Sequence, residues 1–299
     1  MNAIEISNLS KSFKGKKGSR VAALKNLDLT VNQGEIFGFL GPNGAGKSTT
    51  IKTLMGLIRP SSGSARLLGA EISSPAARLK VGFLPENPSF YDYLTAEEYL
   101  NFVGQTFKIS GAILPERVTH ALKLLELWDA RKRAIRGYSK GMVQRLGLAQ
   151  TILHDPDLYI LDEPMSGLDP VGRALVKDLM LDLKRRGKTI FFSTHVIADV
   201  EAVCDRVAIL VKGERRAENV VSELMSEGIV GYVIRLEQTI PVELQEFMTE
   251  TAAIEKGDLY VPRKQFNLFM NKVDRLGCTV HLIEPKRNSL EDFFLKIIS

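Results

Sequence analysis

The sequence has few cysteines and no long apolar segment. Only two of its 299 residues are cysteine, Cys204 and Cys278, which argues against a disulfide framework or a cysteine-based metal site and suits a reducing compartment. No stretch approaches the roughly 18 consecutive apolar residues that form a membrane-spanning helix. Residues 1–6 lack the basic-then-apolar layout of a secretory signal peptide. We therefore expect a cytoplasmic globular chain.

The sequence also lacks a large excess of charge of either sign. The net charge is +5, and the basic clusters at 131–133, 184–186 and 215–216 are short and scattered. Because cations suit helix C-termini, solvated helix ends explain these clusters better than contacts with nucleic acid or anionic lipid. We expect no specific nucleic-acid partner. With 44% hydrophobic and 25% charged residues, the composition is that of a globular chain with a substantial core.

The strongest motif is Gly41–Ser48, Gly-Pro-Asn-Gly-Ala-Gly-Lys-Ser, which matches the phosphate-binding loop pattern at every fixed position. It follows an apolar run at 36–40, fit for a buried strand, and precedes helical spacing over 49–58. Its glycines let backbone N–H groups surround a polyphosphate, Lys47 is expected to reach the β- and γ-phosphates, and Ser48 to hold Mg²⁺. The strand–loop–helix context argues against a glycine-rich loop without a ligand. The sequence therefore predicts a nucleoside triphosphate site.

Two carboxylates end a second apolar run, Leu158–Glu163. Ligands of open α/β sheets lie at strand ends, so Asp162 is predicted to be an outer ligand of the Mg²⁺ and Glu163 a general base that polarises water. His195 ends the next predicted strand, where it could contact the γ-phosphate or the attacking water. The alternatives are that the acids only cap a turn and that the histidine is structural. The phosphate loop in the same chain favours the site.

The order of elements predicts an α/β fold. Short strands are expected over residues 1–40, helical periodicity over 95–153, and alternating strands and helices over 158–211. Such alternation predicts a parallel sheet with helices on both faces, here interrupted by a helical block.

Local signals predict where some elements begin and turn. Lys14–Arg20 reads as an exposed hairpin loop. Thr95 with Glu98 predicts a capping box, and Pro115 the first turn of another helix.

Beyond residue 218 the pattern changes to that of a small α+β module. Ser289 with Asp292 predicts the cap of a last helix. The other expected elements are strands at 230–236, 259–261 and 278–283 and helices at 242–249 and 266–276.

Together these motifs resemble the ATP-binding subunit of ATP-binding cassette (ABC) transporters over about residues 1–217. The resemblance implies a P-loop NTPase fold: a RecA-like core sheet with helices on both faces, an antiparallel β subdomain and an inserted helical subdomain at about 87–153. Residues 218–299 are expected to form a separate small α+β domain. Its end, Ser289–Leu295, resembles the C-terminal domain of ABC-2 type exporter subunits, which leaves its role open between regulation, dimer support and passive stabilisation.

The resemblance also implies site residues. Phe13 falls on the family's base-stacking aromatic, although a packed core phenylalanine is the alternative. The D-loop falls on Ser166–Asp169, and the switch histidine on His195. Hydrolysis is implied to use Glu163, His195 and Glu86, and the metal to be held by Ser48, Asp162 and Glu86. The positions implied to contact ATP are Phe13, Gly41, Pro42, Asn43, Gly44, Ala45, Gly46, Lys47, Ser48, Thr49, Ser139, Gly141 and Asp169.

Two motifs depart from the family pattern. The signature, usually Leu-Ser-Gly-Gly-Gln, falls on Tyr138–Met142, where only Ser139 and Gly141 match strictly. In the family the signature contacts the nucleotide of a partner subunit, so one signature and one phosphate loop imply a homodimer or heterodimer around two ATP molecules. The usual Q-loop glutamine is Glu86, which can ligate Mg²⁺ or hold the attacking water. Alternatively, Glu86 points to solvent or pairs with an arginine of the helical block.

The resemblance implies an ATPase subunit on the inner face of the cell membrane that drives a separate integral-membrane permease, for export. A soluble cassette ATPase acting on ribosomes or nucleic acid is the main rival, but such proteins usually carry two cassettes or a coiled-coil insertion. Within residues 1–217 no Asn-Lys-x-Asp stretch occurs, and the one match, Asn271–Asp274, lies outside the segment with the phosphate loop, which argues against a GTPase switch. Glu163 argues against a nucleotide-binding regulator without turnover.

Overall fold

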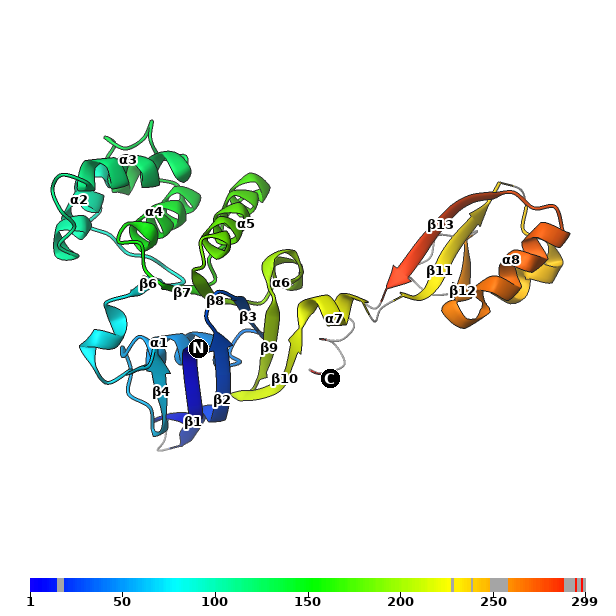
Figure 1. Ribbon diagram of the computed structural model, residues 1–299, viewed down its shortest axis with the longest axis horizontal. Coiled ribbons are helices and arrows are strands. Elements are labelled where there is room, and N and C mark those ends of the chain that lie inside the picture. The colour runs from blue at the N-terminus through cyan, green and yellow to red at the C-terminus, as the bar shows by residue number, and fades with distance from the viewer. Residues whose placement is uncertain are drawn as a thin grey trace. The chain divides into compact units, whose positions relative to one another are not determined.

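The computed structural model (Figure 1) divides the chain into two compact units, Met1–Val220 and Val221–Ser299. The sequence analysis sets the boundary after residue 217. In the part of the chain that the structure describes, no helix is long and apolar enough to cross a membrane. The described residues are 1–14, 19–226, 229–237, 239–247 and 258–287, together with Phe294 and Ile297.

A six-stranded sheet forms the centre of the first unit, in the order β10-β9-β3-β8-β7-β6. All neighbours pair in parallel except β10, which is antiparallel to β9. β3, β7 and β8 are buried along their whole length, as their nearly continuous apolar sequences predict for parallel strands covered on both faces. The strands are β3 (Ile36–Leu40), β6 (Val81–Leu84), β7 (Leu158–Asp162), β8 (Thr189–Thr194), β9 (Arg206–Val211) and β10 (Glu214–Val220).

Helices cover both faces of this sheet, which confirms the predicted fold class. α1 (Lys47–Leu54) lies on one face, and α5 (Pro170–Arg185) and α6 (Ile197–Val203) lie on the other. Successive side chains of β8 point to opposite faces of the sheet, so the strand contributes to the hydrophobic core on each face. Phe191 belongs to the hydrophobic core that includes α1, whereas Phe192 belongs to the core that includes α5.

α1 is shorter than predicted. Helical spacing extends to Ile58, but the helix ends at Leu54. Gly56 adopts a φ of +68°, the left-handed conformation in which glycine commonly terminates helices. The extension of the helix to Ile58 is therefore wrong.

A second, antiparallel sheet has the order β2-β1-β4-β5. Its first two strands are longer than the short strands that the sequence predicts over residues 1–40, because their pairing continues from Asn2 opposite Asn32 to Lys14 opposite Arg20. Residues 15–18 of the predicted hairpin loop lie outside the described residues. The strands are β1 (Asn2–Lys14), β2 (Arg20–Asn32), β4 (Ser62–Leu67) and β5 (Ala70–Glu71).

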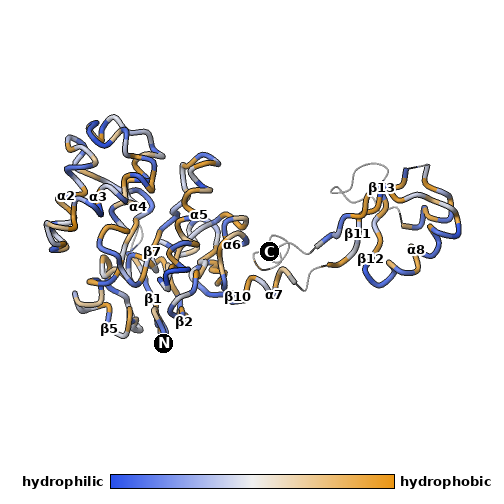
Figure 2. The backbone as a smooth tube through the Cα atoms, turned by 45° about the horizontal axis from the view of Figure 1, so that its top comes forward, coloured by the Kyte–Doolittle hydropathy of each residue, from blue (hydrophilic) through white to orange (hydrophobic). Residues whose placement is uncertain are grey.

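A block of helices is inserted between β6 and β7. The capping box is confirmed, because the Thr95 hydroxyl accepts from the Glu98 N–H at 3.2 Å and the Glu98 carboxylate accepts from the Thr95 N–H at 2.8 Å. Pro115 stands in the first turn of its helix, as predicted. Hydrophobic and hydrophilic residues alternate along these helices (Figure 2), and their buried faces share one core with α5 and the sheet. The helices are α2 (Ala96–Thr106), α3 (Leu114–Leu124) and α4 (Lys140–Ile152), and the 3-10 turn η3 (Ile135–Gly137) lies between α3 and α4 in the chain. Another 3-10 turn, η2 (Pro75–Arg78), precedes β6 and contacts β4, β5 and β6.

The described part of the second unit contains a three-stranded antiparallel sheet, in the order β12-β11-β13, and the amphipathic helix α8. Leu244, Leu259 and Phe269 are buried in its core. The helix expected from residue 242 is a 3-10 turn up to Phe247, and the predicted cap formed by Ser289 and Asp292 lies outside the described residues. The elements are α7 (Val221–Ser226), β11 (Ile229–Leu236), η4 (Val242–Phe247), β12 (Leu259–Pro262), η5 (Arg263–Gln265), α8 (Phe266–Arg275) and β13 (Val280–Arg287).

Candidate active site

The predicted phosphate loop connects β3 to α1 and is held against the neighbouring strand. The Gly41 N–H donates to the Thr194 carbonyl at 3.2 Å. Gly44 and Gly46 have φ angles of +78° and +112°, which side chains other than glycine rarely adopt. A Cβ at Gly46 would also lie 2.6 Å from the Ala23 carbonyl oxygen. The loop therefore takes a shape that requires glycine, and it leads directly into the start of α1, where N–H groups favour an anion.

A pocket of about 320 Å³ lies over this loop. Its lining combines the loop with two acids from other segments, and a pocket of this size suits a small ligand. The lining residues are Ala23, Asn43, Gly44, Ala45, Gly46, Lys47, Ser48, Thr49, Glu86 and Glu163.

Lys47 is the cation of this pocket and is only 6% exposed. Its ammonium group donates to the Gly41 carbonyl at 2.7 Å and lies 3.4 Å from the Glu163 carboxylate. Three N–H donors on one ammonium group allow Lys47 to keep the loop contact while it binds a phosphate oxygen.

Asp162 and Ser48 form a second contact across the pocket floor. The Ser48 hydroxyl donates to the Asp162 carboxylate at 3.3 Å, and the Ser193 hydroxyl donates to the same oxygen at 2.6 Å. Burial raises the pKa of Asp162, and the hydrogen bonds from Ser193 and Ser48 oppose the rise. A hydroxyl and a carboxylate at this separation fit Mg²⁺, which is bound through one or two protein oxygens together with substrate phosphates.

Glu163 and His195 meet at the ends of two neighbouring strands. The His195 Nδ1 lies 3.1 and 3.0 Å from the two carboxylate oxygens of Glu163. Glu163 adopts a φ of +50°, a rare and strained conformation for a residue with a side chain. Its N–H is held by the hydroxyl of Ser193 at 3.0 Å. A carboxylate fixed in this way, facing the phosphate pocket, can accept a proton from a water molecule.

Two residues of this site were missed by the sequence analysis. Ser193 stands opposite Asp162 in the parallel register of β7 and β8 and contacts both Asp162 and Glu163. Gln144, in α4, is 4% exposed and donates to the carbonyls of Glu163 and Pro164 at 3.3 and 3.1 Å. A polar residue within a predicted helix near the signature was the available signal for Gln144, but its partner depends on how that helix packs.

Glu86 lines the phosphate pocket together with Lys47 and Glu163. Its side chain is exposed, and in the described residues it pairs with no arginine of the helical block. The structure therefore leaves the Glu86 carboxylate near the space where phosphates would bind.

Phe13, Ser139, Gly141 and Asp169 do not line this pocket. Phe13 is 41% exposed on β1, with the Lys11 ammonium group 5.0 Å from the ring centre, so the alternative of a packed core residue is wrong. The Ser139 hydroxyl caps α4 by accepting from the Met142 N–H at 3.3 Å. Asp169 caps α5 by accepting from the Gly172 N–H at 2.7 Å.

The sequence of this chain is similar to those of known proteins. Residues 24–166 match the protein family described as ABC transporter. An uncharacterized ABC transporter ATP-binding protein of Synechocystis sp. is 39% identical over 301 residues, which cover 99% of this chain and 84% of the relative. The Nod factor export ATP-binding protein I of Cupriavidus metallidurans is 39% identical over 277 residues, covering 91% of each chain.

A solved structure is similar as well. The ATP-binding cassette MJ0796, in a dimeric post-hydrolysis state bound to ADP and Pi, has a TM-score of 0.68 and 25% sequence identity, and the match covers 73% of this chain and 98% of the cassette. The phosphate loop, the acids at the end of β7 and these similarities agree on one assignment. The chain belongs to the ABC transporter family, as an ATP-binding subunit with ATPase activity.

Proposed function

We propose that this subunit pairs with a second ATP-binding subunit around two ATP molecules and drives export through a separate membrane permease. The observation that carries the proposal is the meeting of the phosphate loop, Glu163 and His195 at one edge of the sheet. The dimeric state of the similar cassette supports the pairing. The Nod factor export protein, which aligns over 91% of this chain, supports export.

Each group of the site has a distinct role in this proposal. Lys47 binds the γ-phosphate, and Ser48 and Asp162 hold Mg²⁺, which when bound neutralises charge on the phosphates. Glu163 accepts a proton from the attacking water, while His195 keeps its carboxylate in place through the contact at 3.0 Å. The exposed ring of Phe13 stacks on the base.

The signature serves the nucleotide of the partner subunit. Ser139 is exposed at the start of α4 and is absent from the lining of its own chain's phosphate pocket. N–H groups at a helix start attract phosphate, so a second chain that faces Ser139 with its phosphate loop completes the site. At Gly141, an ideal Cβ would meet nothing closer than Leu168 at 3.5 Å, so the start of the helix is not crowded there.

We expect two inactive variants to restore activity when mixed. Ser139→Arg blocks the partner's site but not ATP binding by its own monomer, whereas Lys47→Ala removes the cation of its own site. A heterodimer of the two variants contains one composite site with both the phosphate loop and the signature intact. Phosphate release measured at a fixed total concentration should therefore rise above that of either variant alone.

The mixing experiment has a control variant, and two outcomes would contradict the role of Ser139. Ser64→Arg changes another exposed serine, in β4, and should leave ATPase activity unchanged. If Ser139→Arg weakens ATP binding by the monomer, or if mixtures stay inactive, the in-trans role of Ser139 is wrong.

Glu86 is proposed to make nucleotide binding depend on the metal. At about 4 Å and an effective dielectric near 20, two unit charges interact by roughly 4 kcal/mol, an upper figure for a site open to water. A carboxylate in the phosphate pocket therefore repels ATP unless Mg²⁺ stands between them.

We expect Glu86→Gln to reduce the dependence of ATP affinity on Mg²⁺. ATP titrations with Mg²⁺ and with a chelator give the affinity ratio, which should be smaller for Glu86→Gln than for the unmodified chain. Glu71→Gln, which changes an exposed carboxylate on another sheet, is the matched control. Equal ratios for all three proteins would remove Glu86 from the catalytic centre.

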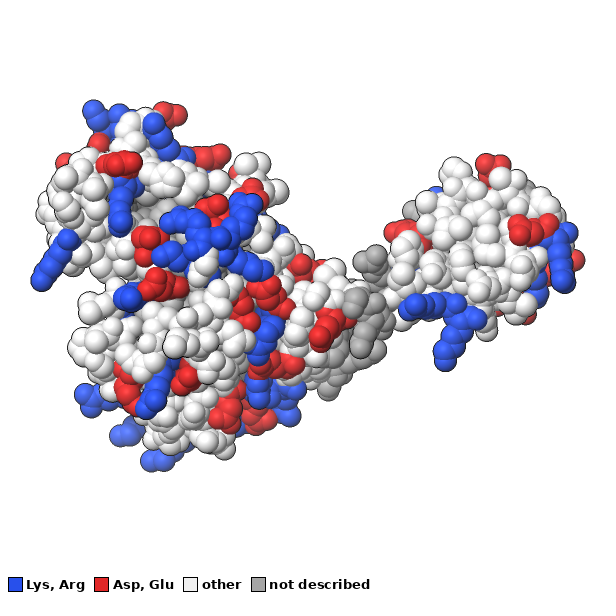
Figure 3. Space-filling view, viewed as in Figure 1, with Lys and Arg blue, Asp and Glu red and all other residues white. Residues whose placement is uncertain are grey.

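The permease is proposed to contact an exposed aromatic surface of the helical block, formed by Tyr91, Tyr93 and Phe102. Their exposed fractions are 55%, 67% and 50%. Tyr91 lies 6.1 Å from Tyr93 and 6.2 Å from Phe102 between ring centres, so the three form one cluster. Exposed apolar clusters mark protein contacts. On the face shown in Figure 3, basic and acidic side chains are interspersed, which favours a protein partner over nucleic acid.

A further inference from the structure

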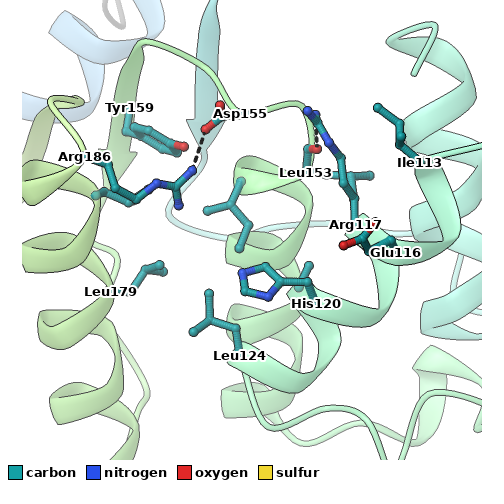
Figure 4. A pocket seen from close by; sticks show the side chains of 13 residues that line it. Ile113, Glu116, Arg117, His120, Leu124, Leu153, Asp155, Tyr159, Leu179 and Arg186 are labelled. Carbon is teal, nitrogen blue, oxygen red and sulfur yellow. Dashed lines mark hydrogen bonds and ion pairs between the residues drawn. The ribbon is translucent and has the colours of Figure 1, made fainter. Parts of the chain in front are cut away.

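A cavity of about 360 Å³ lies beside the start of β7, between α3, the end of α4 and α5 (Figure 4). Tyr159 lines it from the second position of β7, whereas Asp162 ends the same strand at the nucleotide site. The cavity shares no residue with the phosphate-loop pocket. It is therefore a separate site in the same unit.

The hydroxyl of Tyr159 is a donor for which the described residues provide no acceptor. The side chain is 1% exposed, and its oxygen has no hydrogen-bond partner among them. Figure 4 shows the side chain reaching from β7 into the pocket with the hydroxyl at its leading end. Burial raises the pKa of Tyr159 above its ordinary value, so the hydroxyl keeps its proton. A buried hydroxyl without a partner is unfavourable, and a ligand oxygen in the cavity would satisfy it.

Two guanidinium groups give the cavity a preference for an anion. Arg117 donates to the Leu153 carbonyl at 3.2 Å, and in the described residues it has no carboxylate partner. Arg186 lies 2.9 Å from Asp155 and 4.0 Å from Asp182, and Lys188, 3.1 Å from Asp155, adds a further positive charge. The other acid of the lining, Glu116, is exposed. Because a guanidinium group has five N–H donors, Arg117 retains donors for a carboxylate.

Apart from the exposed His120, the rest of the lining is apolar. Leucine and isoleucine side chains from three helices surround the polar groups, and the volume falls in the range of small-molecule sites. These residues are Ile113, Leu124, Ile152, Leu153, Leu179 and Leu183.

We propose that this cavity binds an amphipathic organic carboxylate. The carboxylate accepts a hydrogen bond from Tyr159, with Arg117 and Arg186 supplying positive charge, and the hydrocarbon part lies against the leucines of α3, α4 and α5. The helices that bound the cavity include α4, which is capped by Ser139, so an occupant would contact the opposite end of the helix that carries the signature.

Calorimetric titration of the full chain with octanoate, without nucleotide, tests the site independently of ATP hydrolysis. We expect one octanoate per chain, with 1-octanol binding about tenfold more weakly because it lacks the charge that strengthens the hydrogen bonds. Tyr159→Phe, which removes one oxygen and keeps the ring, should weaken octanoate binding about tenfold, as should Arg117→Gln.

Tyr232→Phe is the matched control, because it removes a hydroxyl from a tyrosine of β11, in the second unit and outside the cavity. It should bind octanoate as the unmodified chain does. Octanoate binding that Tyr159→Phe and Arg117→Gln leave unchanged, or that 1-octanol equals, would locate the ligand on exposed apolar surface and overturn the proposal. Absence of binding up to about 1 mM octanoate would overturn it too, with the hydroxyl then bonded to water.

Discussion

Glu163→Gln is expected to lower ATP turnover by roughly 10²- to 10⁴-fold, the loss typical of removing a general base. The amide keeps the shape of the side chain, and its oxygen can still accept from the His195 Nδ1–H that lies 3.0 Å from the carboxylate. The geometry of the site should therefore survive while its proton acceptor is lost. Phosphate release at saturating Mg-ATP measures the change.

The same substitution should trap the paired state. Glu163 carries a negative charge next to the phosphate pocket, and neutralising it lowers repulsion of ATP. With ATP bound and not hydrolysed, two chains should remain together, which light scattering with and without Mg-ATP detects as a doubled mass. Glu71→Gln, at an exposed ion pair with Arg66, should hydrolyse normally. A Glu163→Gln chain that hydrolyses at the normal rate would end the general-base assignment, and one that stays monomeric would end the pairing.

Lys47→Ala is expected to weaken ATP binding by about 100-fold. Lys47 is 6% exposed, so its bond to a phosphate would form in a partly desolvated site, where hydrogen bonds to charged groups contribute about 1.5–3 kcal/mol each. Its removal also leaves Glu163 without the cation at 3.4 Å, which adds repulsion between that carboxylate and the phosphates.

Equilibrium titration with ATP measures this loss. Lys52→Ala is a matched control, because Lys52 is an exposed lysine on the same helix, α1. It should bind ATP as the unmodified chain does. Near-normal affinity of Lys47→Ala would show that the loop does not bind the nucleotide.

The parts of the fold that depend on residues close together in the sequence were predictable from it. Eight consecutive residues define the phosphate loop, because each needs only a local backbone shape or a donor beside it. β7 and β8 are short apolar runs, and the capping box at Thr95 is a contact between residues three apart. The length of β2 was not predictable in this way, because its exposed half is a strand only through pairing with β1.

The sequence by itself determined that this chain binds a nucleoside triphosphate, and it named the acids that follow β7. Only the tertiary structure decided which groups hold those acids. Ser193 contacts Asp162 because the register of β7 and β8 sets them opposite each other, 31 residues apart in the chain. Gln144 reaches Glu163 because α4 packs against β6, the strand next to β7. Packing also decides that the Tyr159 hydroxyl has no acceptor among the described residues. The cavity around it is enclosed by α3, α4 and α5, which come from separate segments of the chain, so no local sequence pattern predicts it.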